Sequence, residues 1–157
     1  MLIVDDEPSM RKVTRALLQT IGVRTIFEAS DGRGGLEAIC SRMPDVVLLD
    51  WEMPDINGIE FMRAVRSPEN FPLPNVPVIM LTGHNERSLV VEAVNAGVNE
   101  YLLKPVSSTA ILARFVSILA KPRPMVRRGD YYGPAPRKPS TYKPDDDPQL
   151  NHIVLVN

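Results

Sequence analysis

The stretch that decides the fold is Val46-Val47-Leu48-Leu49-Asp50, four apolar residues followed by an acid. Apolar side chains at consecutive positions suit a strand buried on both faces, as in a parallel sheet, whereas alternation would indicate one face in water. Four further runs share the pattern: Leu2-Ile3-Val4, Thr25-Ile26-Phe27, Val78-Ile79-Met80-Leu81 and Tyr101-Leu102-Leu103. The sequence therefore predicts five buried parallel strands.

The segments between these runs carry apolar residues at helical spacing. In the first of them Met10, Val13, Leu17 and Ile21 recur three or four positions apart, and Gly22 is expected to end the helix. We expect Ser9 to cap this helix, and the later helices to begin after Asp31, Asn57 or Gly58, Asn85, and Ser107 or Ser108. Strands that alternate with helices, joined by right-handed crossovers, predict an α/β fold with a helix layer on each face of the sheet.

Composition sets the broad class of the protein. The 157 residues are 44% hydrophobic and 24% charged, which is ordinary for a soluble globular protein. No apolar run approaches the roughly 20 residues of a membrane span, and the only cysteine, Cys40, has neither a disulfide partner nor metal-site spacing. We therefore expect a protein of the reducing cytoplasm.

The net charge of −1 hides two unlike parts. Residues 1–120 contain 11 Lys and Arg against 15 Asp and Glu, whereas residues 121–157 contain 7 Lys and Arg against 4 Asp. Seven of the 15 prolines also lie in residues 121–157, a density at which neither a helix nor a central strand persists. The sequence thus predicts a folded domain over 1–120 and a basic, proline-rich tail over 121–157, with 122–151 extended and mostly unstructured.

Polar residues with related chemistry follow four of the five predicted strands. They are Asp5-Asp6-Glu7, Asp50, Thr82-Gly83 and Lys104-Pro105. In open α/β sheets, ligands bind beyond the carboxyl ends of the strands, so these side chains should meet at one edge. Polar residues commonly end strands, but their joint occurrence at four ends makes a chance grouping much less plausible.

The expected grouping suits phosphoryl transfer. Two carboxylates about 5 Å apart repel by roughly 3 kcal/mol at an effective dielectric near 20, so three of them need a cation or a proton. Oxygen ligands without His or Cys favour a hard ion, Mg²⁺ or Mn²⁺. Together with Lys104 such an ion would neutralise a phosphoryl group, and the Thr82 hydroxyl could donate to it. Asp50 is the candidate nucleophile, since Asp5 and Asp6 are better placed as metal ligands.

These motifs together resemble the receiver domain of two-component response regulators. The matching segments are Val4-Asp5-Asp6-Glu7, Leu48-Leu49-Asp50-Trp51-Glu52-Met53-Pro54, Asn57-Gly58, Thr82-Gly83 and Tyr101-Leu102-Leu103-Lys104-Pro105. The resemblance covers residues 1–120 and implies a flavodoxin-like (βα)5 fold, a three-layer α/β/α sandwich with strand order 2-1-3-4-5.

The resemblance also implies a role for each site residue. Asp50 would be the phosphoacceptor, and magnesium would be bound by Asp5, Asp6, Asp50 and the backbone carbonyl of Glu52. Thr82 and Lys104 would contact the phosphoryl oxygens, and Lys104-Pro105 would be a cis peptide. Thr82 and Tyr101 would act as the switch, repacking the surface of the fourth helix, fifth strand and fifth helix.

By the same resemblance the chain is a bacterial, cytoplasmic signalling protein rather than an enzyme. A histidine kinase, a His-containing phosphotransfer protein or a small phosphodonor would supply the phosphoryl group, and a downstream protein effector would read it. We expect no direct nucleic-acid or membrane partner, and we expect the apolar fifth helix to offer a partner or homodimer face. Two alternatives stay open: a phosphatase or phosphotransferase with an aspartate nucleophile, in which Glu52 would be the acid, and a scaffold that does not signal.

The tail permits three interpretations. Arg127 to Lys138 combine paired tyrosines with flanking cations, which suits a solvated linker, a docking peptide for a protein partner or a weak nucleic-acid contact. This stretch is similar to tails of some stand-alone receivers of alphaproteobacteria. The terminal residues His152 to Val156 are apolar and strand-like, so they could add to a sheet edge.

Overall fold

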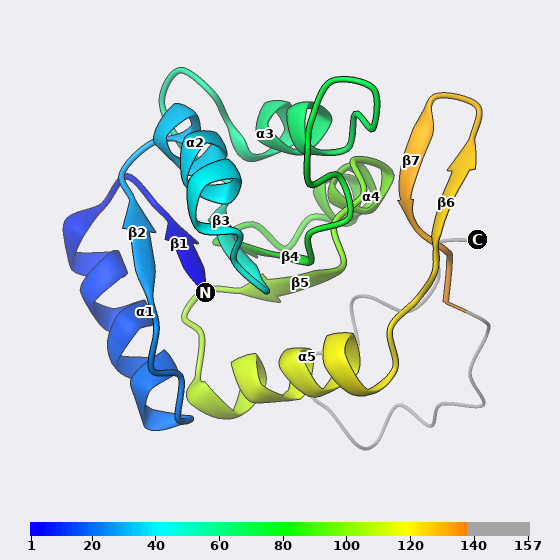
Figure 1. Ribbon diagram of the computed structural model, residues 1–157. Helices are drawn as coiled ribbons and strands as arrows, with labels where there is room; N and C mark the ends of the chain where they lie inside the picture. Colours follow the sequence, from blue (N-terminus) through cyan, green and yellow to red (C-terminus); the bar gives the residue numbers. More distant parts are fainter. Residues whose placement is uncertain (138–157) are drawn as a thin grey trace.

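The structure, a computed structural model, describes residues 1–137. Its centre is a parallel sheet of five strands in the order β2-β1-β3-β4-β5 (Figure 1). The strands are β1 (Leu2–Val4), β2 (Phe27–Ala29), β3 (Val47–Asp50), β4 (Val78–Thr82) and β5 (Glu100–Leu103). This is the predicted α/β/α sandwich with the flavodoxin-like strand order, and that prediction is confirmed.

Five helices cover the two faces of the sheet. They are α1 (Pro8–Thr20), α2 (Gly32–Arg42), α3 (Gly58–Val65), α4 (Arg87–Asn95) and α5 (Ser108–Ala120). One buried cluster joins α2, α3 and α4 to the sheet through Ile39, Phe61 and Val90. The other joins α1 and α5 to it through Leu18 and Ile111. The central strands are buried on both faces because each face has its own core.

Most helix starts follow the sequence prediction. The Asp31 side chain accepts from the Gly34 amide at 2.7 Å, and Asn57 forms a reciprocal capping box with Glu60. Ser107 accepts from the Ala110 amide at 3.1 Å.

Several boundaries differ from the prediction, among them the starts of α1, α4 and β2. The first helix begins at Pro8, whose fixed φ already suits a first helical position, so Ser9 lies inside the helix and does not cap it. Helix α4 follows Glu86 rather than Asn85. Strand β2 begins at Phe27 because the three residues of β1 pair from Leu2 opposite Phe27 onward.

The predicted tail contains a β-hairpin that the sequence analysis missed. Strands β6 (Met125–Arg128) and β7 (Tyr131–Pro134) pair antiparallel across a turn at Gly129, whose φ is +58°. The prediction of an extended, mostly unstructured chain is therefore wrong for these two strands. Proline is tolerated because it stands at the end of β7 and outside β6, where no ladder bond is lost.

The remainder of the predicted tail, with the strand-like residues His152 to Val156, lies outside the described residues. The domain boundary at residue 120 stays a prediction.

The basic hairpin lies against acidic and carbonyl groups of the domain. Arg127 pairs with Glu69, and Arg137 pairs with the buried Glu100. The Arg123 guanidinium donates to the carbonyl of Asn99 at 2.5 Å and, within the hairpin region, to Ala135 at 3.0 Å. Ion pairs between the basic hairpin region and the acidic domain thus help to dock the hairpin on the domain.

Candidate functional site

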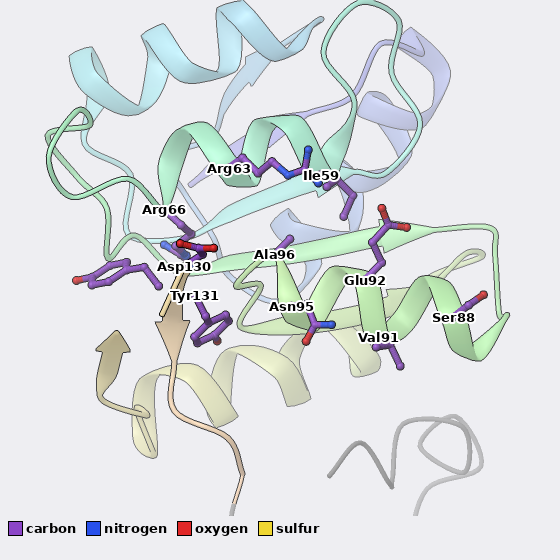
Figure 2. Close-up of a pocket in the computed structure, with 11 residues that line it drawn as sticks. Ile59, Arg63, Arg66, Ser88, Val91, Glu92, Asn95, Ala96, Asp130 and Tyr131 are labelled. Carbon is purple, nitrogen blue, oxygen red and sulfur yellow. The ribbon is translucent and has the colours of Figure 1, made fainter. Parts of the chain in front are cut away.

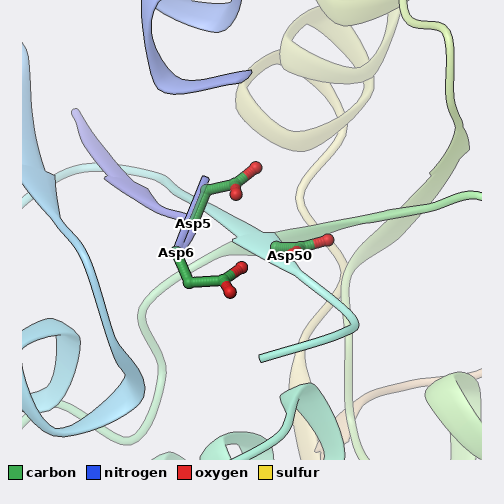
Figure 3. A group of neighbouring side chains, drawn as sticks. All are labelled: Asp5, Asp6 and Asp50. Atoms are coloured by element: carbon green, nitrogen blue, oxygen red, sulfur yellow. The ribbon is translucent and has the colours of Figure 1, made fainter. Parts of the chain in front are cut away.

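Three carboxylates meet at the carboxyl ends of β1 and β3 (Figure 3). Asp5 and Asp6 directly follow β1, and Asp50 ends β3, which pairs with β1 in the sheet. One oxygen of each lies within 4.8 Å of the others. Asp5 and Asp50 are buried, whereas Asp6 is exposed, so solvent reaches the cluster at Asp6.

Lys104 brings a cation to the cluster from the end of β5. Its Nζ donates to Asp50 Oδ1 at 2.8 Å and lies 3.7 Å from Asp5 Oδ2. The Lys104 amide donates to the Thr82 carbonyl at 2.7 Å, and the peptide that follows, to Pro105, is cis as predicted. The register of β4 and β5 thus holds the ammonium over the acids.

Burial and pairing perturb both charges of this ion pair. Burial raises the pKa of Asp50 above its ordinary value, and the charges of Asp5 and Asp6 add to this, against the bond and charge of Lys104. Burial alone would lower the pKa of Lys104, but the bond to Asp50 and the charges of the acids outweigh it and raise the pKa. Lys104 therefore stays an ammonium at neutral pH.

Thr82 and Tyr101 lie beside the cluster and share one backbone segment. The Thr82 hydroxyl, which is buried, accepts from the His84 amide at 3.0 Å. The Tyr101 hydroxyl donates to the His84 carbonyl, and its ring is packed inward among the core residues. Burial raises the pKa of the Tyr101 phenol, against a hydrogen bond with Thr82 that lowers it. The two predicted switch residues are joined through His84.

A pair of charged side chains spans the rim of the site. His84 Nε2 contacts Glu52 Oε1, and His84 Nδ1 lies 3.7 Å from Glu86 Oε2. The hydrogen bond that the imidazole donates to Glu52, together with the charges of Glu52 and Glu86, raises the pKa of His84, whereas burial acts in the opposite direction. Sequence reasoning did not predict this pair, although each partner lies two positions beyond a site residue, Asp50 or Thr82.

The residues present fit a hard divalent cation. All three converging ligands are carboxylates, and among residues 1–137 a single ammonium, that of Lys104, forms an ion pair with them. Such a set leaves an excess of negative charge that Mg²⁺ or Mn²⁺ would neutralise. The role of the Glu52 carbonyl as a fourth protein ligand stays a prediction.

Comparisons with known proteins place the chain in a family. The family model described as the response regulator receiver domain matches residues 1–116. The chain belongs to the response regulator receiver family. It is similar to the chemotaxis protein CheY of Pseudomonas aeruginosa, with 37% identity over 120 residues, which are 76% of this chain and 95% of that protein. It is also similar to the chemotaxis protein CheY-3 of Vibrio cholerae, with 34% identity, covering 76% and 91%.

A solved structure agrees with this placement. A putative response regulator from Chloroflexus aurantiacus J-10-fl superposes with a TM-score of 0.69 at 30% identity, covering 76% of this chain and 96% of that one. Receiver domains are signalling switches of bacterial two-component systems that interact with histidine kinases and downstream effectors, and they bind Mg²⁺ at a cluster of aspartates. Within residues 1–137, no helix is long and apolar enough to cross a membrane.

Proposed function

We propose that this receiver is a phosphorylation-activated switch in which Asp50 accepts a phosphoryl group from a phosphohistidine donor. The observation that carries the proposal is the buried Asp50 carboxylate, held at 2.8 Å by Lys104 beside two further acids. A carboxylate in this setting is oriented, and the Lys104 ammonium that can bind a phosphoryl oxygen is already beside it.

The chemistry follows from the positions of the side chains. An oxygen of Asp50 attacks phosphorus, the phosphorus–nitrogen bond of the donor breaks, and the product is an acyl phosphate on Asp50. The Lys104 ammonium turns from the carboxylate to a phosphoryl oxygen, and the Thr82 hydroxyl donates to another. A Mg²⁺ ion held by Asp5, Asp6, Asp50 and the Glu52 carbonyl would supply further neutralisation of charge.

The switch then works through the link between Thr82 and Tyr101. When the Thr82 hydroxyl moves to the phosphate, its hydrogen bond with the His84 amide breaks. The Tyr101 hydroxyl donates to the carbonyl of His84, so the same residue is bonded to both switch residues. The segment that leads into α4 therefore responds to the charge on Asp50. We propose α4, β5 and α5 as the output surface toward a protein effector or a second copy in the cytoplasm. Exposed Leu112, Val116 and Leu119 on α5 support this proposal, since they are apolar and face solvent.

Mass spectrometry tests the proposal directly. The intact protein is incubated with Mg²⁺ and a small phosphodonor such as acetyl phosphate, and we expect one labile phosphoryl group that hydroxylamine removes. The Asp50→Asn variant should gain none, while Asp45→Asn, which changes an exposed acid at the other end of the strand, should behave as the native protein. A labile phosphate retained by Asp50→Asn would contradict the assignment.

The two alternatives make other predictions. A phosphatase needs an acid free to protonate the leaving group, yet the Glu52 carboxylate is paired with His84. Turnover of phosphate esters in Mg²⁺ would nevertheless favour the phosphatase. A scaffold that does not signal would show no Mg²⁺-dependent change in the fluorescence of Trp51, which directly follows Asp50.

A further inference from the structure

The hairpin formed by β6 and β7 contacts the turn between α4 and β5 through backbone atoms on both sides. A Cβ atom built on Gly97, at φ +93°, would meet the Tyr132 carbonyl at 2.8 Å. A Cβ atom built on Gly133 would meet the Tyr131 hydroxyl at 2.6 Å and the Gly97 Cα at 2.9 Å. Contact this close requires glycine on both sides, so the hairpin is fitted to the turn rather than loosely apposed to it.

A buried cation fixes the other side of the same turn. Arg66, which follows α3, donates to the Gly97 carbonyl at 2.9 Å and to Asn99 Oδ1 at 2.8 Å. Tyr132 of the hairpin bonds Asn75 Oδ1 at 2.6 Å, in the loop before β4. Figure 2 shows Arg66, α4 and the hairpin residue Tyr131 around one pocket of about 430 Å³. The end of α4 is therefore held between α3 and the hairpin.

The start of β5 is held in the same way. Arg123, which leads into the hairpin, donates to the Asn99 carbonyl at 2.5 Å, and the Asn99 amide donates to the Val78 carbonyl at 2.9 Å. Tyr101 lies two positions further along β5. Arg137, which leaves the hairpin, pairs with Glu100, the first residue of that strand. The hairpin thus contacts the turn that follows α4 and the start of β5, and both elements belong to the proposed output surface.

We propose that docking of the hairpin and phosphorylation of Asp50 are coupled through α4 and β5. Helix α4 and strand β5 have the phosphoryl site at one end, through Thr82, Tyr101 and Lys104, and the hairpin at the other. The hairpin region holds Asn99 and Glu100, the two residues just before the buried Tyr101, so docking favours the arrangement in which the ring is inward. In this proposal the phosphorylated state also has the ring inward, and phosphorylation therefore favours docking. Because coupling between two sites is reciprocal, each event strengthens the other by the same factor. This inference rests on the proposed function.

Hydrogen exchange on the full chain tests the coupling. Beryllium trifluoride with Mg²⁺ serves as the phosphoryl mimic, and Trp51 fluorescence reports its binding. We expect the mimic to slow exchange of the hairpin amides several-fold. Gly133→Ala, which places a Cβ atom against Gly97, should weaken binding of the mimic by the same factor. Gly129→Asn is the matched control, because asparagine tolerates a positive φ and nothing lies within 4 Å of that position.

The outcomes separate the two proposals. If Trp51 responds to the mimic but hairpin exchange is unchanged or faster, or Gly133→Ala binds like the native chain, the coupling is overturned and the proposed function stands. If Trp51 does not respond even in the native chain, both are overturned. Should Gly133→Ala fail to fold, Arg123→Gln, which removes the bonds to Asn99 and Ala135, replaces it with the same expectation.

Discussion

Replacing Arg66 by methionine should destabilise the protein far more than an arginine substitution normally does. The guanidinium donates to the carbonyls of Gly97, Pro74 and Val76 and to the side chain of Asn99, at 2.9, 2.6, 2.8 and 2.8 Å. Burial lowers its pKa to about 10, which still leaves it charged at neutral pH. Within residues 1–137, no carboxylate forms an ion pair with Arg66. Carbonyl oxygens therefore take the place of water around its guanidinium.

The size of the effect follows from the acceptors left behind. The bonds to Gly97 and Val76 are buried, and each carbonyl orphaned there costs about 1–3 kcal/mol. Water can reach the two other acceptors, and methionine removes the cost of burying a cation, so we expect a net loss of about 3 kcal/mol. With a urea m-value of about 2 kcal/mol/M, the unfolding midpoint should fall by about 1.5 M.

Arg63→Met supplies the matched control. This arginine lies one turn earlier on the same side of α3 but is exposed, so its loss should change the free energy of unfolding by at most about 0.5 kcal/mol. Urea unfolding followed by circular dichroism measures both variants. Equal midpoints for the two variants would refute the reasoning, because they would show that the four hydrogen bonds of Arg66, two of them buried, add nothing to stability.

Three further predictions concern the site and the core. Asp50→Asn should stabilise the protein when no divalent ion is present, and by more at pH 7 than at pH 4. The pKa of Asp50 is raised above 3.8 in the folded protein, so the free energy of unfolding falls as the pH rises from 3.8 through the pKa of the folded state. Unfolding midpoints of both proteins at the two pH values check this. Gly35→Ala should cost about 1–3 kcal/mol because its Cβ would lie 2.9 Å from a side chain of β1. Gly34→Ala should cost less in thermal melts, because its Cβ would lie 3.2 Å from the capping oxygen of Asp31 and alanine favours the helix. Tyr101→Phe should lose about 1–2 kcal/mol in urea unfolding, since the ring stays packed and the hydrogen bonds of its hydroxyl to the His84 carbonyl and to Thr82 are removed. An unchanged midpoint would contradict those bonds.

The parallel sheet could be predicted because its signal is local. A strand buried on both faces must be apolar at successive positions, and β3 and β4 show this without ambiguity. The positions of Asp5, Asp50, Thr82 and Lys104 at one edge then followed from the topology alone. The start of β2 could not be predicted in the same way, because it depends on the register with β1.

The hairpin was missed although its signal was present. Gly129-Asp130 separates Met125–Arg128 from Tyr131–Pro134 by two residues, a spacing typical of a tight hairpin turn. The density of proline favours an unstructured tail, yet the one proline within the two strands, Pro134, stands at the end of β7, where no ladder bond is needed.

Contacts of long sequence separation were beyond local patterns. Arg66 receives its partners from positions 74 to 99, and Glu52 meets His84 across 32 residues. The sequence around Arg66 does not distinguish a buried arginine from a solvated one. Likewise, the sequence around Glu52 does not show whether this glutamate is paired or free. Only the folded chain brings these groups together.

The docked hairpin also sets where the last described residue lies. Without the hairpin, the described chain would end at α5; with it, the described chain ends at Arg137, which is anchored to Glu100 on the edge strand of the sheet. A module tethered after that point would start beside β5 and at the opposite end of the strand from Lys104. Fusions or labels placed behind residue 137 would therefore share that edge with the proposed output surface, while leaving the mouth of the carboxylate cluster unobstructed.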